Sequence, residues 1–197
     1  MQDKIISRRS NKIRTQETRA KLIAAARFLF LQKGYAETST PEIVKAAKIT
    51  RGALYHHFTD KADLFKAVVI EEAKGIAEHI DKTSEKAGSS FEALMLGSQA
   101  YFEAMSMQGR ARLLLIEGPA VLGLTVMAEI DNQFGGAALR EGLENAIGHN
   151  NLPLDELTVI LSAGFDRAAL AVAEGGDVSK YLNVLQALLQ SLVQKTN

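Results

Sequence analysis

Basic, hydroxyl and small side chains follow one another around residue 50 in an order that suits contact with nucleic acid. Arg51 carries a planar guanidinium that can grip the two acceptors on a guanine edge, while Gly52 and Ala53 allow close approach and contact with a thymine methyl group. Thr50 precedes them with a hydroxyl group, and Lys61 follows with an ammonium group at a helix start, where phosphates bind. These residue types predict an interface with double-stranded DNA.

Two short helices are expected to position these groups, joined by a turn at residues 47–49. In the second helix, Arg51, Tyr55 and His56 fall on the outward side, where they can contact DNA. Both helices also show apolar positions at helical spacing, which would face a core. These positions are Ile43, Val44, Ala47, Leu54 and Phe58. The pattern is that of a helix-turn-helix, whose second helix presents its first residues to base edges in the major groove.

Capping residues define where these helices begin. Ser39 or Thr40 can cap the first helix, and Pro41 suits its first turn because no N–H partner is needed there. Thr50 caps the second helix in the same way. Asp60 caps a third helix, so the motif ends at this point.

A longer helix over residues 15–33 is expected to support the motif, because two turns of helix cannot bury a core alone. Gly34 closes this helix as a left-handed terminator. Its apolar stripe consists of Leu22, Ala25, Ala26, Leu29 and Phe30. Residues 1–13 show little periodicity and are expected to form a flexible basic arm, either a mobile tail or an extension that touches DNA. A DNA-binding domain over residues 14–60 would follow.

Several of these positions together resemble the DNA-binding domain of the tetracycline-repressor (TetR) family. The resemblance covers about residues 14–66. It is carried by Ala25-Ala26, Leu29-Phe30, Gly34-Tyr35, Thr38, Ile43, Ala47, Leu54-Tyr55-His56-His57-Phe58, Lys61 and Leu64. Residues 113–123 also resemble the regulatory domains of some members.

The resemblance implies further contacts and an architecture. Tyr55 and His57 match family positions that contact the DNA backbone, and Ser39 or Thr40 is expected to do the same. The helix after the motif would link the DNA-binding domain to a regulatory domain over residues 61–197. The implied fold is all-α: an N-terminal three-helix helix-turn-helix domain plus a C-terminal helical domain for ligand binding and dimerisation.

Lys48 departs from the family, in which a glycine commonly occupies this position of the turn. If the residue must adopt a positive φ, a lysine there costs about 1 kcal/mol. Two interpretations stay open at this point. Either the turn is relaxed, or the amine compensates for the strain by reaching a phosphate.

The distribution of charge agrees with a DNA-binding N-terminal part. Residues 1–60 contain 12 Lys and Arg against 5 Asp and Glu, a net charge of +7, whereas residues 61–197 contain 11 against 18, a net charge of −7. An isolated basic cluster is usually a solvated face. Here the positive charge coincides with the motif, and a protein that reads DNA needs both to neutralise phosphates and to present side chains.

Length and composition exclude several other classes. A chain of 197 residues with 47% hydrophobic residues suits one small and one medium domain. Cysteine is absent, which excludes disulfides and thiolate metal sites and agrees with a reducing cytoplasm. The longest uncharged run, residues 181–194, falls short of the roughly 18 apolar residues that a membrane span requires. The N-terminus has no signal-peptide core, so a cytoplasmic protein without a membrane partner is expected.

No pattern indicates catalysis, a metal ion or a cofactor. His56 and His57 are adjacent and would point about 100° apart on a helix, and His79 and His149 are isolated. Residues 97–100 lack the second glycine of a nucleophile elbow, and no phosphate-cradling glycine loop occurs. An enzyme is therefore not expected.

After residue 60 the pattern predicts only helices. Their expected ranges are 61–85, 91–107, 110–117, 119–148, 155–174 and 178–194. Breaks are expected at Gly109, Gly118-Pro119, residues 150–153 and Gly175-Gly176.

The last two helices carry faces suited to self-association. Small residues that allow close approach lie on the first, and a broad apolar stripe lies on the second. These residues can also serve an intramolecular core, and some must do so. A homodimer is expected, because helix-turn-helix proteins commonly read two half-sites through a two-fold partner. The expected interface residues are Ile160, Gly164, Ala168, Leu182, Leu185 and Leu189.

Residues between 91 and 165 can line a cavity among helices for a small-molecule effector. The candidate lining residues are Phe91, Tyr101, Phe102, Met105, Leu113, Glu117, Met127, Phe134 and Phe165. Each of them can instead be an ordinary core residue, and the neighbouring Arg112, Asp131 and Asp166 either orient a ligand or face water. The mixed apolar and aromatic character suits a hydrophobic or amphipathic compound.

The sequence therefore predicts a homodimeric repressor that a small-molecule effector releases from a palindromic DNA operator. Activation instead of repression stays open. One alternative is a dimeric DNA-binding protein without an effector. Another is a helical small-molecule carrier or enzyme whose basic N-terminal part is incidental.

Overall fold

The structure is a computed structural model and describes residues 2–148 and 152–194. Over these residues the regular elements are helices and no strand occurs, which confirms the all-α prediction. The chain divides into two compact units, Met1–Val69 (unit 1) and Ile70–Asn197 (unit 2). The division falls within helix α4 (Lys61–Ser84) and not at residue 60, because the first turns of α4 bury Leu64, Phe65 and Val68 in the core of unit 1.

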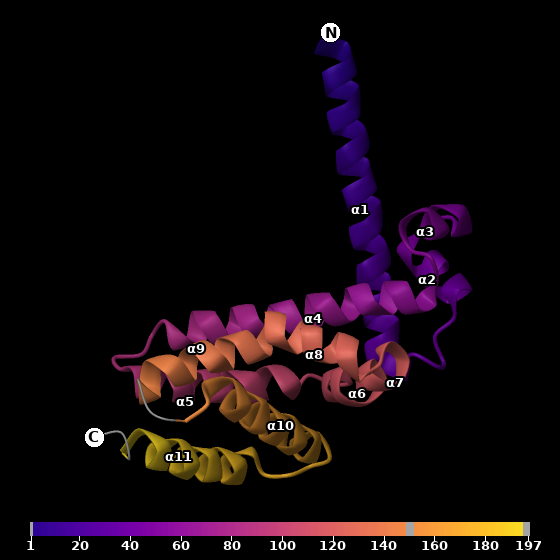
Figure 1. Cartoon of the computed structure of the whole chain (residues 1–197). Coiled ribbons are helices and arrows are strands. Elements are labelled where there is room, and N and C mark those ends of the chain that lie inside the picture. The colour runs from indigo at the N-terminus through magenta and orange to yellow at the C-terminus, as the bar shows by residue number, and fades with distance from the viewer. Residues whose placement is uncertain (1, 149–151, 195–197) are drawn as a thin grey trace. The chain divides into compact units, whose positions relative to one another are not determined.

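Unit 1 combines helices α1 (Gln2–Lys33), α2 (Thr40–Ala47) and α3 (Arg51–His57) with the start of α4. Helix α1 contacts both α2 and α3, which pair with each other beside it (Figure 1). The fully buried side chains at the centre are Leu22, Phe30, Ile43, Leu54, Leu64 and Phe65. Leu54 and Phe58 face inward as predicted, so the motif has the expected core.

The N-terminal segment differs from the expected flexible arm. Helix α1 begins at Gln2, so the backbone of residues 2–13 continues the helix predicted for residues 15–33. No glycine or proline interrupts residues 2–33, and the segment is rich in Lys, Arg and Gln, which are good helix formers. The helix ends where predicted, at Gly34, whose φ of 86° is left-handed and whose N–H donates to the Phe30 carbonyl oxygen at 2.9 Å.

Unit 2 contains the remainder of α4 and a series of further helices. In chain order these are α5 (Ser90–Met105), α6 (Arg110–Arg112), the π-helical turn η1 (Leu113–Glu117), α7 (Gly118–Leu122), α8 (Leu124–Gln133), α9 (Gly135–Ile147), α10 (Leu154–Ala173) and α11 (Val178–Gln194). Leu94, Leu143, Leu161 and Leu189 form one buried cluster from α5, α9, α10 and α11.

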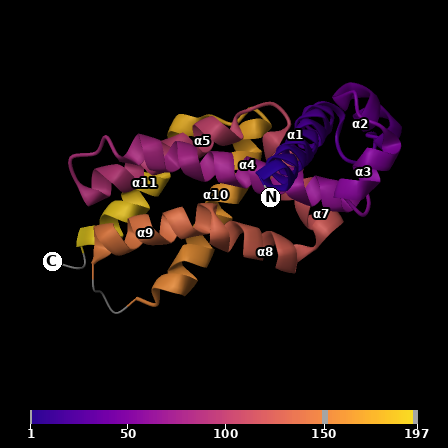
Figure 2. The same ribbon diagram turned by 90° about the horizontal axis from the view of Figure 1, so that it is seen from above.

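The segment expected as one helix over residues 119–148 is divided into three. Gly123, with φ of 82°, separates α7 from α8, and Phe134 separates α8 from α9. Helices α8 and α9 still follow one another along nearly one line, as Figures 1 and 2 show. The expected break at Gly118-Pro119 is wrong, because the π-helical turn η1 leads directly into α7. Pro119 lies in the first turn of α7, where its missing N–H needs no partner.

The apolar stripe of α11 is divided between core and surface. Leu185 and Leu189 are buried within unit 2, which corrects their assignment to a dimer interface, and Ala168 on α10 is buried as well. Leu182 is half-buried. Ile160 and Gly164 on α10 are exposed, as expected for an interface. The outward apolar residues of α11 are Val184 and Leu188, 60% and 51% exposed, because they lie one position away from the core residues.

Candidate nucleic-acid interface and effector cavity

The turn before α3 is held by short-range hydrogen bonds. The Thr50 hydroxyl accepts the Ala53 N–H at 3.2 Å and caps α3 as predicted. Arg51 and Gly52 are exposed, and a Cβ atom added at Gly52 would meet nothing within 4 Å. The N-terminal turn of α3 therefore presents a guanidinium beside an open backbone surface, which is the geometry that a base contact needs.

Tyr55 lies on the outward side of α3 between two polar neighbours. Its ring is 43% exposed and receives the Arg51 guanidinium at 5.5 Å from the ring centroid. A hydrogen bond with Thr40, and a smaller contribution from one with Arg51, lower the pKa of the Tyr55 phenol. Three residues that the sequence assigns separately to DNA contact thus form one connected surface of α2 and α3.

His56 and His57 stack edge to face with their ring centroids 5.4 Å apart. His56 is exposed and His57 is half-buried. Burial, the neighbouring His56 and Arg19 lower the pKa of His57. The lowered pKa favours the neutral imidazole of His57, which can form a hydrogen bond with the DNA backbone.

Ser39 begins α2 with a reciprocal cap. Its backbone N–H and its hydroxyl donate to the Glu42 carboxylate at 2.9 and 2.8 Å. Lys33 adds an ion pair to Glu42 at 2.6 Å. The hydrogen bonds from Lys33 and Ser39 lower the pKa of Glu42 to about 2. Ser39 is exposed, so it stays a candidate for a phosphate contact with its hydroxyl engaged in the cap.

Lys48 adopts the left-handed conformation that a glycine would take, with φ of 54° and ψ of 42°. The N–H groups of Lys48 and Ile49 donate to the carbonyl oxygens of Lys45 and Val44, at 3.2 and 3.0 Å, which is the Schellman pattern at a helix end. The interpretation of a relaxed turn is therefore wrong. The side chain of Lys48 is exposed, which leaves a contact with phosphate as the open interpretation.

Lys61 folds back onto the loop between α1 and α2. Its ammonium group donates to the carbonyl oxygens of Tyr35 and Thr38 at 2.9 and 3.0 Å, and it lies 4.1 Å from the centroid of the Tyr35 ring. Two of its three N–H donors are thus used inside unit 1, so at most one is left for a phosphate. Sequence reasoning missed this role, because the contact spans residues far apart in the chain.

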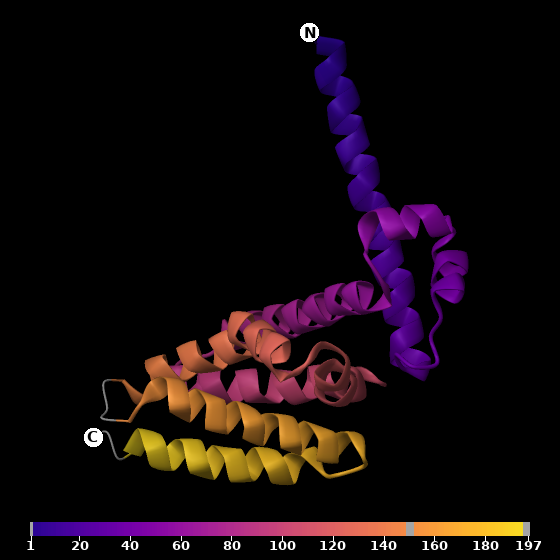
Figure 3. The ribbon, with the colours of Figure 1, turned by 45° about the vertical axis from the view of Figure 1, so that its right-hand side comes forward.

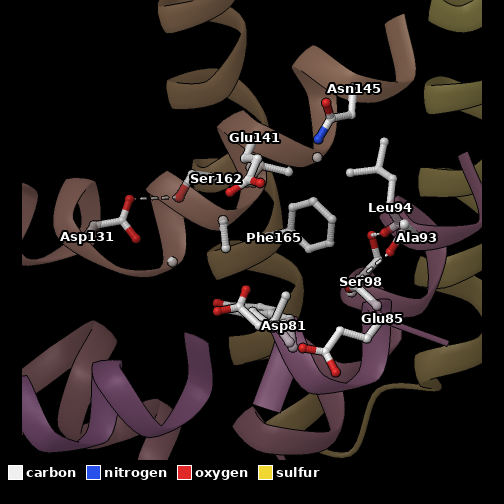
Figure 4. Close-up of a pocket in the computed structure, with 18 of the residues that line it drawn as sticks. Asp81, Glu85, Ala93, Leu94, Ser98, Asp131, Glu141, Asn145, Ser162 and Phe165 are labelled. Carbon is white, nitrogen blue, oxygen red and sulfur yellow. Dashed lines mark hydrogen bonds between the residues drawn. The ribbon is translucent and has the colours of Figure 1, made fainter. Parts of the chain in front are cut away.

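Unit 2 contains a cavity of about 440 Å³ that is partly open to solvent and lies within the size range of small-molecule sites. Its lining comes from five helices, α4, α5, α8, α9 and α10, together with Glu85, which follows the end of α4. In Figure 4, Asp81 and Glu85 on one side face Glu141 and Asn145 on the other, with the Phe165 ring between them. The lining residues are Ile80, Asp81, Ser84, Glu85, Ala93, Leu94, Gly97, Ser98, Tyr101, Asp131, Gly135, Ala138, Leu139, Glu141, Gly142, Asn145, Ser162, Phe165 and Asp166.

Two of the nine predicted effector residues, Tyr101 and Phe165, line this cavity. Phe102, Met105 and Leu113 are buried core residues, and Phe91 packs against the leucine cluster. Met127 lies against Gly118, where an added Cβ atom would come within 2.8 Å of its methyl carbon. The remaining two residues, Glu117 and Phe134, do not belong to this lining; Glu117 pairs with Arg112 at 3.4 Å.

Polar residues form a part of the lining that the sequence did not predict. Asp131 and Asp166 appear in the sequence only as polar groups near apolar runs, whereas Asp81, Glu85, Glu141 and Asn145 carry no sequence signal for a cavity. Acidic residues on a helix usually face water. Only the tertiary structure brings these side chains of separate segments around one space.

A short hydrogen bond joins two cavity residues that lie far apart in the sequence. The Tyr101 hydroxyl donates to the Asp166 carboxylate at 2.6 Å, and the Tyr101 ring packs edge to face on Phe165 with centroids 5.6 Å apart. Burial raises the pKa of Asp166 to about 6, against the lowering effect of the Tyr101 hydrogen bond. Burial also raises the pKa of Asp131, although this carboxylate accepts a hydrogen bond from Ser162 at 3.1 Å.

The described residues do not include a group of three or more His, Asp or Glu side chains placed to hold one metal ion. His149, one of the isolated histidines of the sequence, lies outside the described residues. Among the described helices, none has the length and apolar content to cross a membrane.

A capped helix-turn-helix in one unit and a helical unit that contains a cavity are typical of DNA-binding regulatory proteins. Residues 22–68 match the family described as bacterial regulatory proteins, tetR family, and residues 91–195 match the tetracyclin repressor-like C-terminal domain. The chain belongs to the TetR family, a family of regulatory proteins and not of enzymes.

Individual relatives agree with this membership. The transcriptional regulator AcrR of Shigella flexneri is 50% identical over 60 residues, which cover 30% of this chain and 28% of AcrR. TtgR of Pseudomonas putida is 39% identical over 77 residues, 39% of this chain and 36% of TtgR. The crystal structure of a TetR-family regulator from Pectobacterium atrosepticum, 29% identical, covers 93% of this chain and 96% of its own with a TM-score of 0.71. The chain thus spans about a third of the curated relatives it matches first, but nearly all of this solved structure.

Proposed function

We propose that this protein is a transcriptional regulator that binds a DNA operator as a homodimer and is released when a small molecule occupies the cavity of unit 2. The observation that carries the proposal is the exposed, capped start of α3. Arg51, Gly52 and Tyr55 form one continuous outward surface there, in the part of the chain with a net charge of +7 over residues 1–60.

Side chains around α3 divide into base-contacting and backbone-contacting groups. Arg51 reads a base edge, and Gly52 and Ala53 permit the approach. The remaining contacts are to phosphates and set the register on DNA without reading sequence. They come from Ser39, Thr40, Lys48, Thr50, Tyr55, His56, His57 and, with its last N–H donor, Lys61.

Dimerisation through α10 and α11 is supported by the apolar residues left on the surface of unit 2. Ile160 is 68% exposed and Val184 and Leu188 are 60% and 51% exposed, on two helices that run in opposite directions (Figure 3). A two-fold pairing of these faces would bury them and would match a palindromic operator with half-sites roughly 34–36 Å apart.

Release would act through α4, which begins in unit 1 and carries cavity residues Asp81 and Ser84 near its other end. An effector that prefers one arrangement of α4 would alter the spacing of the two α3 helices. It can weaken operator binding only by the difference between its affinities for the two arrangements.

The test is selection of bound duplexes from a random DNA pool by the purified protein, with the Arg51→Ala variant run in parallel. An inverted repeat is expected from the unaltered protein. Arg51→Ala should lose about 1–3 kcal/mol of binding and relax the sequence at one position in each half-site. Equal losses on selected and random DNA would refute the base-reading role of Arg51, and no enrichment by folded protein would refute the operator.

The dimer has its own test in analytical sedimentation. Leu188→Glu places a charge on the exposed face and should yield monomers, whereas Gln186→Glu on the same helix should leave the dimer intact. If Leu188→Glu remains dimeric at low concentration, the interface does not involve this face of α11.

A further inference from the structure

Acidic side chains dominate the charge of the cavity in unit 2. Five carboxylate residues line it, and no Lys, Arg or His does. Four come from helices α4, α8, α9 and α10, and Glu85 follows the end of α4. The five residues are Asp81, Glu85, Asp131, Glu141 and Asp166. Figure 4 shows Asp81 and Glu85, Glu141 and Asp131 approaching the space from three sides. Asp131 and Asp166 are partly buried, whereas Asp81, Glu85 and Glu141 are exposed residues of the lining. Together the five acids give the cavity a negative potential.

None of these five carboxylates forms an ion pair with a residue in the described part of the chain. The acidic partners in the ion pairs of unit 2 are instead Glu72, Glu78, Glu103, Glu117, Glu144 and Asp155. Two cavity carboxylates have hydrogen-bond donors: Tyr101 for Asp166, and Ser162 with the Gly136 N–H for Asp131. These donors are neutral, so they reduce the cost of burial without removing the charge.

A ligand that fills the cavity displaces water from these carboxylates. The charge of the ligand then determines whether binding is favourable. An anion would be repelled by all five groups. A neutral ligand would leave partly buried Asp166 and Asp131 desolvated without compensation. A cation would supply the counter-charge that the protein itself lacks, which favours the ionised carboxylates.

The rest of the lining selects a cation with an apolar body. Ile80, Leu94, Ala138 and Leu139 supply apolar contacts, and the rings of Tyr101 and Phe165 offer aromatic faces to a cation. A bare metal ion fits poorly for two reasons: the cavity of about 440 Å³ suits a small organic molecule, and no three acids of the described chain converge to hold a metal.

We propose that the cavity of unit 2 binds an organic cation that carries an aromatic or aliphatic body. This inference rests on the proposed function, in which the cavity receives the effector, and it gives the effector a chemical class. Asp166 and Glu141 contact the cationic group or lie next to it, while Phe165 and Tyr101 contact the body.

The experiment measures binding to the full-length protein by equilibrium dialysis, with probes paired by size and shape and opposite in charge. Benzyltrimethylammonium is compared with benzenesulfonate, and tetraphenylphosphonium with tetraphenylborate. We expect at least one cation to bind with one site per chain and at least tenfold more tightly than its matched anion. Asp166→Asn and Glu141→Gln should each weaken that cation by about tenfold.

Glu129→Gln is the matched control, because Glu129 is exposed on α8, does not line the cavity and undergoes the same loss of charge. It should leave cation binding unchanged. A thermal unfolding scan distinguishes a loss of binding from a loss of stability. Asp166→Asn should raise the unfolding temperature of the free protein while it lowers the affinity for the cation. If Asp166→Asn lowers both the unfolding temperature and the affinity for the cation, Asp166 has only a structural role, and its assignment to the cation site is wrong.

Equal or tighter binding of the matched anions would overturn the proposal, as would an equal loss of cation binding in Glu129→Gln. Absence of cation binding in protein that still enriches an operator would overturn the inference and leave the proposed function standing. Cation binding that depends on Asp166 and Glu141, in protein that enriches no operator, would uphold the chemistry of the cavity and refute only the proposed function.

Discussion

Lys61 in unit 1 and Asp166 in unit 2 are both partly buried charged residues, but their surroundings differ. The Lys61 ammonium has two backbone carbonyl oxygens and an aromatic ring against it. Asp166 has one hydroxyl donor and no cation, and a second carboxylate, Asp131, raises its pKa further. A charge with a full set of partners stabilises its own unit. A partly buried charge that lacks a counter-charge lowers stability. Binding of a ligand of opposite charge is one function that such a group can serve.

Glu72 and Arg110 provide a second compensated pair, this time inside unit 2. Arg110 donates from Nε to the Glu72 carboxylate at 2.5 Å and from Nη1 to the Ala104 carbonyl oxygen at 2.7 Å. Arg110 is only 9% exposed and Glu72 only 2%. The pair joins α4 to α6, and the second bond of Arg110 reaches α5. In unit 2, the charges of Glu72 and Arg110, which link helices, compensate one another. The carboxylates of the cavity have no such counter-charge.

The largest expected effect follows from breaking the compensated pair. Glu72→Ala leaves a buried guanidinium without its carboxylate, so the free energy of unfolding should fall by about 3–5 kcal/mol. Denaturant unfolding followed by circular dichroism measures it. Glu71→Ala, an exposed neighbour on α4, should change stability little; similar losses in the two variants would contradict a special role for the pair.

Lys61→Ala tests whether the ammonium serves structure more than DNA. Removing its bonds to Tyr35 and Thr38 should lower the free energy of unfolding by about 2 kcal/mol, as expected for hydrogen bonds to a charged group. The slope of operator affinity against salt should change by less than one unit. Unchanged stability with a full unit lost from the slope would instead make Lys61 a phosphate contact.

Asp166→Asn tests the uncompensated charge through pH. The folded-state pKa of about 6 lies above the ordinary value of 3.8, so the folded protein binds this proton more tightly than the unfolded chain. Stability from this group is therefore greatest below about pH 4 and is lost as pH rises toward 6 and beyond. At pH 7.5, Asp166→Asn should stabilise the free protein by about 1–3 kcal/mol.

Unfolding curves collected from pH 4 to pH 7.5 check this expectation. The difference between Asp166→Asn and the unaltered protein should grow with pH, and it should be small at pH 4. A difference that stays constant across the range would mean that the carboxylate of Asp166 is not the titrating group.

Lys48→Gly has the smallest expected effect. It relieves the left-handed strain at φ of 54° and should stabilise unit 1 by about 1 kcal/mol. Lys48→Gln keeps the strain and removes the charge, so a loss of salt dependence shared by both variants would identify a phosphate contact. If Lys48→Gly fails to stabilise the protein, the turn holds a lysine without strain.

Residues close together in the chain determined most of what could be read from the sequence about unit 1. Thr50 caps a backbone N–H three residues ahead, Ser39 and Glu42 cap one another, and Gly34 ends α1. Lys48 takes the left-handed position that the turn demands. The caps at Thr50, Ser39 and Gly34 each span three or four residues, so residue types and spacing are sufficient to predict them. The conformation of Lys48 stayed open in the sequence, because a lysine there departs from the expected glycine.

Tertiary structure alone decided the direction of the Lys61 ammonium, the division of the α11 leucines between core and surface, and the acidic lining of the cavity. Asp81, Glu141 and Asp166 look like ordinary solvent-facing acids on three separate helices. The tertiary structure places them around one space. Helical periodicity predicts the face on which a residue lies but not which residues of other helices lie near it.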